Sequence, residues 1–199
     1  PELIEIRRGE SGIRAWAAEP GEYYHSFDGS YGGLWRRNGR PPQLLAGVGF
    51  SAQGKFEGSY YRRTAESRAP DLAWMFEGIE DQEILGDFGF SGGGAAGFEL
   101  DRADVRLGTP EEVRVVASSE NHTSSFVLVP EEMLTHITNW PGEEEQQKLI
   151  RSDIVYFRTP SGGEVFSTGS ITFCGSLPWN DFDNNISRLL ENVIRRFLQ

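Results

Sequence analysis

One carboxylate of this sequence has a setting that suggests proton-transfer chemistry. Glu99 lies between Phe98 and Leu100, just after a run in which six of the twelve residues from 86 to 97 are Gly. In a strand, Glu99 would face opposite to Phe98 and Leu100. Partial burial in a cleft would raise the pKa of this carboxyl toward that of a general base. We take Glu99 as the candidate catalytic residue; the alternative is a solvent-facing Glu on a half-buried strand.

A second segment, residues 19–29, gathers carboxylates, phenols and an imidazole in a turn-rich stretch. Tyr23, Tyr24 and His25 are consecutive within it. A solvated loop would explain the turn residues, although surface loops seldom carry so many aromatic side chains. The roles of these three residues stay open.

Two familiar glycine motifs lack the element that each requires. Residues 47–52 match G-x-G-x-x-A, but the residues that follow form a poor helix, so a dinucleotide site is not expected. Residues 89–93 match G-x-S-x-G around Ser91, yet glycines follow where a nucleophile elbow needs a helix. A serine hydrolase that uses Ser91 is therefore a weaker, third hypothesis.

The metal-binding residue types are too scattered to predict a zinc site. His25, His122, His136 and Cys174 show no ligand spacing. Cys174 lies in an apolar strand pattern, and we expect it to be a small buried side chain.

Short strands separated by Gly and Pro must position these residues in the first part of the chain. Turn residues bound a series of β-rich runs, and no helix is expected before residue 111. The predicted strands are Leu3–Arg8, Ile13–Ala17, Gln43–Phe50, Gly58–Arg63, Ala73–Glu77, Ile84–Phe90 and Gly97–Leu100.

The second part mixes strands with helices. Strands are predicted at 113–118 and 125–129, a hairpin joins 153–158 to 164–172, and helices are expected over 130–140 and 143–150. From Ile186 to Leu198, apolar residues recur at i, i+3, i+4, i+7 and i+8, which predicts an amphipathic helix. Asp181 or Asp183 would cap it, and it should pack on a sheet that contains 164–172.

The composition excludes several classes of protein. The 199 residues are 38% hydrophobic and 12% aromatic, which is enough to build a core, and they carry a net charge of −11. The acidic balance argues against nucleic-acid binding, and no apolar run approaches the roughly 18 residues of a membrane span. A single cysteine excludes a disulfide framework. No signal peptide is visible, so a cytoplasmic location is expected.

The C-terminal residues resemble a known family. The run Gly163–Leu177, with 183–188 and 192–197, is similar to the end of the large subunit of N,N-dimethylformamidase and its relatives. Residues 19–35 and 94–102 resemble the same family, so the resemblance spans essentially the whole chain. It implies a glutamine-amidotransferase-like α/β region with β-rich segments woven in, and enzymes that hydrolyse a small amide. It also implies one iron, held by two tyrosines and a glutamate, that acts as a Lewis acid.

The chain departs from this family in ways that bear on the metal. The family's His-Pro-Glu and Gly-Gly-Asn segments have no match in these residues, and by family order both lie upstream of Pro1. The ligand tyrosines lie upstream as well, so no metal ligand is expected here, Tyr23 and Tyr24 included, and iron is expected in the full-length parent. A further active-site carboxylate of the family falls, by spacing, on Glu99.

These observations predict an α+β fold: a mainly antiparallel, twisted sheet with few helices and the C-terminal amphipathic helix packed on it. We expect a single C-terminal domain over residues 1–199, β-rich in 1–110 and α/β in 111–199, that is inactive alone. Its expected partners are the upstream part of the subunit, a small subunit, further copies of itself and a small amide substrate. The alternative is a non-catalytic, β-rich module that binds a partner or a ligand.

Overall fold

The chain folds around one curled antiparallel sheet, which confirms the predicted α+β class. The computed structural model describes residues 25, 27–30, 35–129 and 142–199. Its strands are β1 (Gly49–Arg63), β2 (Ala96–Arg102), β3 (Arg114–Glu120), β4 (Val127–Leu128), β5 (Asp153–Arg158) and β6 (Glu164–Ser167). Its α-helices are α1 (Pro42–Ala46), α3 (Glu143–Leu149), α4 (Phe173–Ser176) and α5 (Asn185–Phe197). Short 3-10 helices are η1 (Trp35–Asn38), η2 (Glu66–Arg68), η3 (Pro70–Phe76), η4 (Val105–Leu107) and η5 (Trp179–Phe182). None of the described helices has the length and apolar character needed to cross a membrane.

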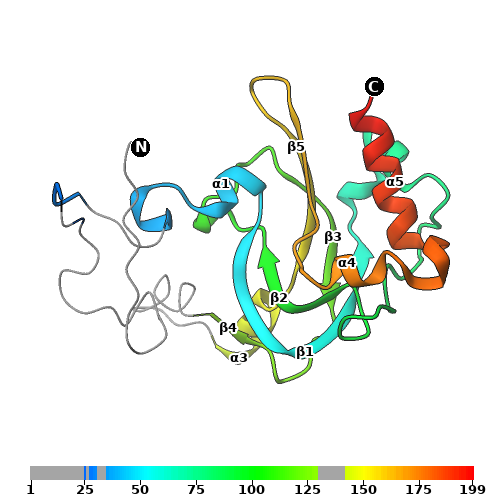
Figure 1. Cartoon of the computed structure of the whole chain (residues 1–199), viewed down its shortest axis with the longest axis horizontal. Coiled ribbons are helices and arrows are strands. Elements are labelled where there is room, and N and C mark those ends of the chain that lie inside the picture. The colour runs from blue at the N-terminus through cyan, green and yellow to red at the C-terminus, as the bar shows by residue number, and fades with distance from the viewer. Residues whose placement is uncertain (1–24, 26, 31–34, 130–141) are drawn as a thin grey trace.

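The long strand β1 organises the sheet. The strand order is β2-β1-β3-β5-β6, and β4 also pairs with β1. The first part of β1 lies against β2 and β4, and its end lies against β3. The segment after β6 returns to β2, where Leu100 and Ser170 form a bridge and the Asp101 amide donates to the Gly169 carbonyl oxygen at 2.7 Å. The sheet therefore curls until its two ends meet (Figure 1).

The largest core lies between the sheet and α5. Tyr61 and Ile154 of the sheet are fully buried there, as are Ile186 and Leu189 of the helix. The α5 helix packs against η3, and the Asn192 amide donates to the Met75 carbonyl oxygen at 3.0 Å. The apolar periodicity predicted this helix correctly.

The N-cap of α5 differs from the prediction, whereas the predicted packing of the helix on the sheet that contains residues 164–167 is confirmed. The N-cap is Asn184, whose side chain accepts from the Ser187 amide at 2.9 Å, and not Asp181 or Asp183. Asp181 instead has a positive φ within η5. Contact with the strand predicted at 164–172 is made through Glu164, which pairs with Arg196 at 3.3 Å.

Several other predicted elements are confirmed and several are wrong. The strand at 153–158, the hairpin that follows it and the helix at 143–149 are present. Residues 43–50 form α1 and only the start of β1, because Pro41 and Pro42 favour the first turn of a helix. Residues 73–77 belong mainly to the 3-10 helix η3, which likewise begins at a proline. The strand predicted at 84–90 is reduced to a bridge between Leu85 and Tyr61. The strands predicted at 3–8 and 13–17 and the helix at 130–140 lie outside the described residues.

Candidate functional site

The candidate site lies where β1 and β2 pair irregularly. Gly58 of β1 is opposite Gly97, and Gln53 is opposite Glu99, so residues 54–57 face a single residue, Phe98. Phe98 has a φ of 59°, a left-handed conformation that is uncommon for a bulky residue. Bulges of this kind redirect the side chains that follow, and strained backbone gathers at functional sites. The irregularity sets the direction of Glu99.

Glu99 and a second carboxylate, Asp101, lie on the same face of β2. Strand alternation places these two residues on one side of the strand and Leu100 on the other, where Leu100 joins a buried apolar cluster. The pairing with β1 puts Gln53 opposite Glu99 and Phe50 opposite Asp101, so all four side chains share one face. All four are half-buried. Glu99 is thus neither enclosed in a cleft nor fully exposed to solvent, which were the two alternatives from the sequence. It lies half-buried on one face of the sheet.

The pKa of Asp101 is raised to about 6, first by desolvation and then by the nearby charge of Glu99. Within the described part of the chain, no hydrogen-bond donor or basic group pairs with either carboxylate. In mildly acidic solution, up to about pH 6, Asp101 therefore holds a proton that an ordinary aspartate has already lost. Two neighbouring carboxylates in different environments are the arrangement in which one acts as an acid and the other as a base.

A third carboxylate, Asp153, shows what a structural carboxylate looks like in this fold. Asp153 is fully buried on β5, and three donors satisfy it. These donors are the Ala103 amide at 2.9 Å, the Ser118 hydroxyl at 2.7 Å and the Arg151 guanidinium at 3.1 Å. Buried polar groups are normally satisfied in this way. Glu99 and Asp101 have no such partners among the described residues, so their surroundings differ from those of Asp153.

The two glycine motifs do not form the sites that their patterns name. Gly47 ends α1 and strand β1 begins at Gly49, so no helix opens at the G-x-G-x-x-A residues. Ser91 lies in a turn that leads to β2 and not to a helix, so the nucleophile elbow is absent. The serine hydrolase hypothesis loses its structural basis.

The remaining residues that the sequence singled out are those of segment 19–29 and Cys174. Tyr23 and Tyr24 lie outside the described residues. His25 is described: its Nδ1 lies 3.9 Å from a carboxylate oxygen of Asp28, which is exposed. Cys174 lies in α4 and is exposed, so the prediction of a buried strand residue is wrong. The sheet already ends at Ser167, and the apolar residues near Cys174 belong to a helix instead.

His122 forms a small polar cluster that sequence reasoning did not anticipate. Its Nε2 lies 2.6 Å from the Ser119 hydroxyl, and its ring packs on Phe126 with the ring centroids 4.8 Å apart. Burial lowers the pKa of His122 to about 4, so the ring is neutral near pH 7. The Ser119 hydroxyl is buried and also accepts from the Ser152 amide at 2.7 Å. These contacts fit a role in packing.

The described residues offer no evident metal site. No group of three or more His, Cys, Asp or Glu side chains within them is arranged to hold a metal ion.

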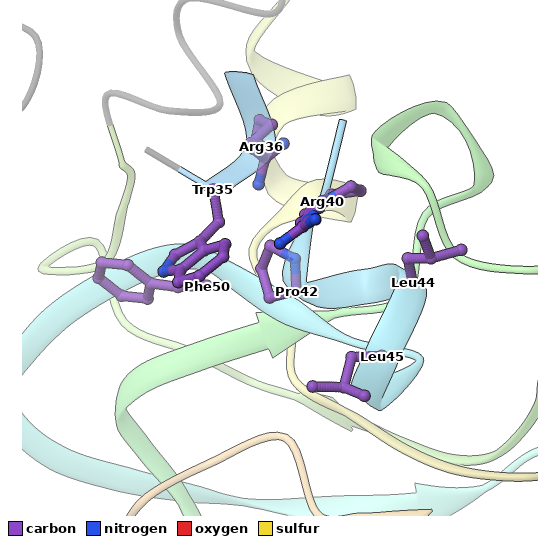
Figure 2. Close-up of a pocket in the computed structure, with 8 residues that line it drawn as sticks. Trp35, Arg36, Arg40, Pro42, Leu44, Leu45 and Phe50 are labelled. Carbon is purple, nitrogen blue, oxygen red and sulfur yellow. The ribbon is translucent and has the colours of Figure 1, made fainter. Parts of the chain in front are cut away.

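A pocket of about 640 Å³ lies beside the same pair of strands, at the Phe50 end (Figure 2). Phe50 links the two features, because it lines the pocket and is opposite Asp101 in the sheet. The lining combines apolar side chains with two guanidinium groups: Trp35, Arg36, Arg40, Pro41, Pro42, Leu44, Leu45 and Phe50.

The pocket residues are positioned by α1 and by the segment that leads into it. Pro42 starts the helix, and Gly47 ends it with a φ of 78° and an amide that donates to the Gln43 carbonyl oxygen. This single turn of helix presents Leu44 and Leu45 outward. The Arg40 guanidinium lies 6.0 Å from the Trp35 ring, a cation–π contact.

Sequence reasoning identified Glu99 but missed its neighbours. Asp101 was detectable, because residues two apart in a strand share a face. Phe50 and the pocket carried no such signal, because their place depends on pairing between residues about fifty positions apart.

Comparison of the sequence with known proteins finds a matching family and two relatives. Residues 1–185 match the family described as N,N-dimethylformamidase beta subunit-like, C-terminal. Proteins named N,N-dimethylformamidase beta subunit, from Alcaligenes sp and Paracoccus aminophilus, are each 40% identical over all 199 residues. The chain spans only 26% of the length of each relative.

Proposed function

Because this chain belongs to the N,N-dimethylformamidase beta subunit-like, C-terminal family, we propose that it is the C-terminal part of an amide hydrolase subunit and that Glu99 serves its active site. Full-length coverage by two 40% identical relatives supports the first part of the proposal. The second part rests on one structural observation. Glu99 and Asp101 form an unpaired acidic couple on a half-buried sheet face, directly after a strained bulge.

Amide hydrolysis needs both a base and an acid, and this couple can provide both. Water attacks the carbonyl carbon and gives up a proton; the C–N bond then breaks and the leaving nitrogen takes up a proton. In our proposal, Glu99 accepts the proton of the attacking water or orients the substrate amide. Asp101, with its raised pKa, holds the neighbouring proton that the leaving amine requires.

The remaining parts of the proposal concern groups outside these residues. The substrate is a small linear amide, in keeping with the printed names of the relatives. The metal that the family resemblance implies would be held by the upstream part of the subunit. A small subunit and further copies of the protein would complete the assembly, in the cytoplasm.

Replacement of Glu99 by Gln in the full-length subunit tests the role of this carboxylate. The amide keeps the size and polarity of the side chain but cannot accept a proton, so we expect kcat for a formamide substrate to fall about a hundredfold or more. Glu111→Gln, at an exposed position, is the matched control and should retain activity. Unchanged turnover in E99Q would instead favour the alternative, a non-catalytic module. One observation supports that alternative: the exposed apolar residues around the pocket.

A further inference from the structure

The pocket beside Phe50 is an exposed apolar feature that the proposed chemistry leaves unused. Leu45 is 82% exposed, Trp35 64% and Leu44 55%. All three line one hollow, and all three lie within residues 35–45 (Figure 2). They are therefore not isolated surface residues. A contiguous apolar patch bordered by polar groups is typical of an interaction site.

Two cations of this pocket have no anionic partner among the described residues. Neither Arg36 nor Arg40 forms an ion pair with the described residues, although the chain contains 30 acidic residues. Arginines elsewhere do find partners: Arg114, for example, pairs with both Glu66 and Asp71. The Nη1 of Arg36 is shielded from solvent and has no hydrogen-bond acceptor within the described part of the chain. Because a guanidinium cannot lose its charge, an uncompensated buried N–H is costly, and an acceptor from an occupant would relieve that cost.

The chemistry of the pocket defines its occupant. The apolar floor fits an aliphatic or aromatic side chain, and the planar guanidinium groups at its edge fit a carboxylate. We propose that the pocket binds a segment of the parent subunit outside these 199 residues, through an apolar side chain flanked by an Asp or a Glu. This proposal rests on the proposed function, since it requires that the chain be part of a longer subunit.

Length and charge favour this occupant over a second copy of the chain. The relatives are about four times as long, so most of the subunit lies outside the structure. A symmetric contact between two copies would bring this pocket against itself, and would place Arg36 and Arg40 close to the same cations of the partner. A segment bound in the pocket would also contact Phe50, which is opposite Asp101 in the sheet. It would therefore help to hold the sheet face that carries Asp101 and Glu99.

Thiol labelling in the full-length subunit tests occupancy. In a Cys174→Ser background, which removes the exposed native thiol, Leu45→Cys is labelled with a maleimide under native conditions and in urea. We expect native labelling at least tenfold slower than labelling of the unfolded protein. Leu198→Cys is the matched control, because Leu198 is 81% exposed in this structure, and its rate calibrates the reagent. A native rate at Leu45→Cys within about twofold of the unfolded rate would overturn the proposal.

The same variant in the 199-residue chain identifies the source of the protection. We expect fast labelling there, with near-UV circular dichroism to verify native packing. Slow labelling of this chain alone would assign the pocket to one of its own segments and overturn the proposal. If Leu45→Cys of the full-length subunit is protected but loses that protection on dilution, a second copy of the protein occupies the pocket. This outcome would also overturn the proposal.

Charge reversal tests the carboxylate. Arg36→Glu with Arg40→Glu, introduced into the full-length Leu45→Cys protein, should raise the native labelling rate at least fivefold, whereas Arg36→Lys with Arg40→Lys should keep most of the protection. Equal rates in all three proteins would refute the acidic partner. Labelling needs no substrate, so a subunit without amidase activity, which would contradict the proposed function, still gives a result here.

Discussion

Three carboxylates near the middle of the sheet show how environment assigns different roles to one chemical group. Asp153 accepts three hydrogen bonds and is fully buried, which makes it a structural anchor. Asp101 is half-buried without such donors, and Glu99 lies beside it. The pKa of Asp101 is raised, and groups with perturbed pKa values gather at functional sites.

The raised pKa of Asp101 predicts a pH-dependent stability difference. Its folded-state value of about 6 exceeds its ordinary value of 3.8, so the native state binds more protons than the unfolded state between these values. The stability that protonated Asp101 contributes is present below about pH 4 and is lost as the pH rises through 6. Asp101→Asn removes this titration. Relative to the wild type, the variant should gain about 1 kcal/mol in free energy of unfolding between pH 5 and pH 8, after allowance for partial exposure.

Urea unfolding of both proteins at the two pH values measures this difference. The exposed Asp87→Asn is the control, and its difference from the wild type should stay constant. A constant difference for Asp101→Asn as well would mean that burial does not perturb this carboxyl.

At the scale of elements, the glycine-dense run allows two stretches of backbone to touch. A Cβ on Gly94 would overlap the Ser59 carbonyl oxygen, and one on Gly97 would overlap the Glu57 carbonyl oxygen. Gly58, in turn, lies against Gly94. A run so rich in glycine lets backbone approach a neighbouring group closely, and here that neighbour is the chain's own strand β1. The glycines thus hold β2 in the register that displays Glu99.

Substitution within this contact should be costly. Gly97→Ala places a methyl group on the backbone of β1, which cannot yield as a flexible side chain can, so we expect a loss of about 3 kcal/mol in free energy of unfolding. Gly142→Ala is the matched control, because its Cβ would meet no atom within 4 Å, and it should cost under about 1 kcal/mol. Chemical denaturation compares the two. Similar small losses would show that β1 and β2 separate easily here.

At the scale of the whole molecule, closure of the curled sheet joins its two ends next to the candidate site. The Ser170 hydroxyl donates to the Gly97 carbonyl oxygen and accepts from the Gly97 amide, both at 2.9 Å. The adjoining bridge runs from Ser170 to Leu100. The carboxylate pair on β2 is therefore held from both edges of its strand, which keeps a half-exposed face rigid.

The proposal that this chain is one part of a longer amide hydrolase subunit predicts where iron binding and activity are found. The family resemblance implies that the metal ligands lie upstream of these residues, so we predict that the 199-residue chain binds no stoichiometric iron and shows no activity on formamides. The full-length subunit should show both. Elemental analysis and an amidase assay on the two proteins, purified in parallel, make the comparison. Stoichiometric iron together with activity in the 199-residue chain would place the metal ligands inside it.

The sequence alone determined the features that depend on local pattern. The periodicity of residues 186–198 predicted α5, and the turn residues near 160 predicted the β5–β6 hairpin. Such signals act between neighbours in the chain, where spacing decides which side chains share a face.

Tertiary structure alone decided what surrounds Glu99. The bulge opposite Phe98, the exposure of Asp101 and the meeting of Phe50 with β2 all follow from pairing between residues about fifty positions apart. The pocket, whose two arginines have no ion-pair partner in the described part of the chain, likewise appears only once α1 has folded beside β1. The physical reason is that burial, and hence the pKa and the availability of a charged group, depends on what packs against it from distant parts of the chain.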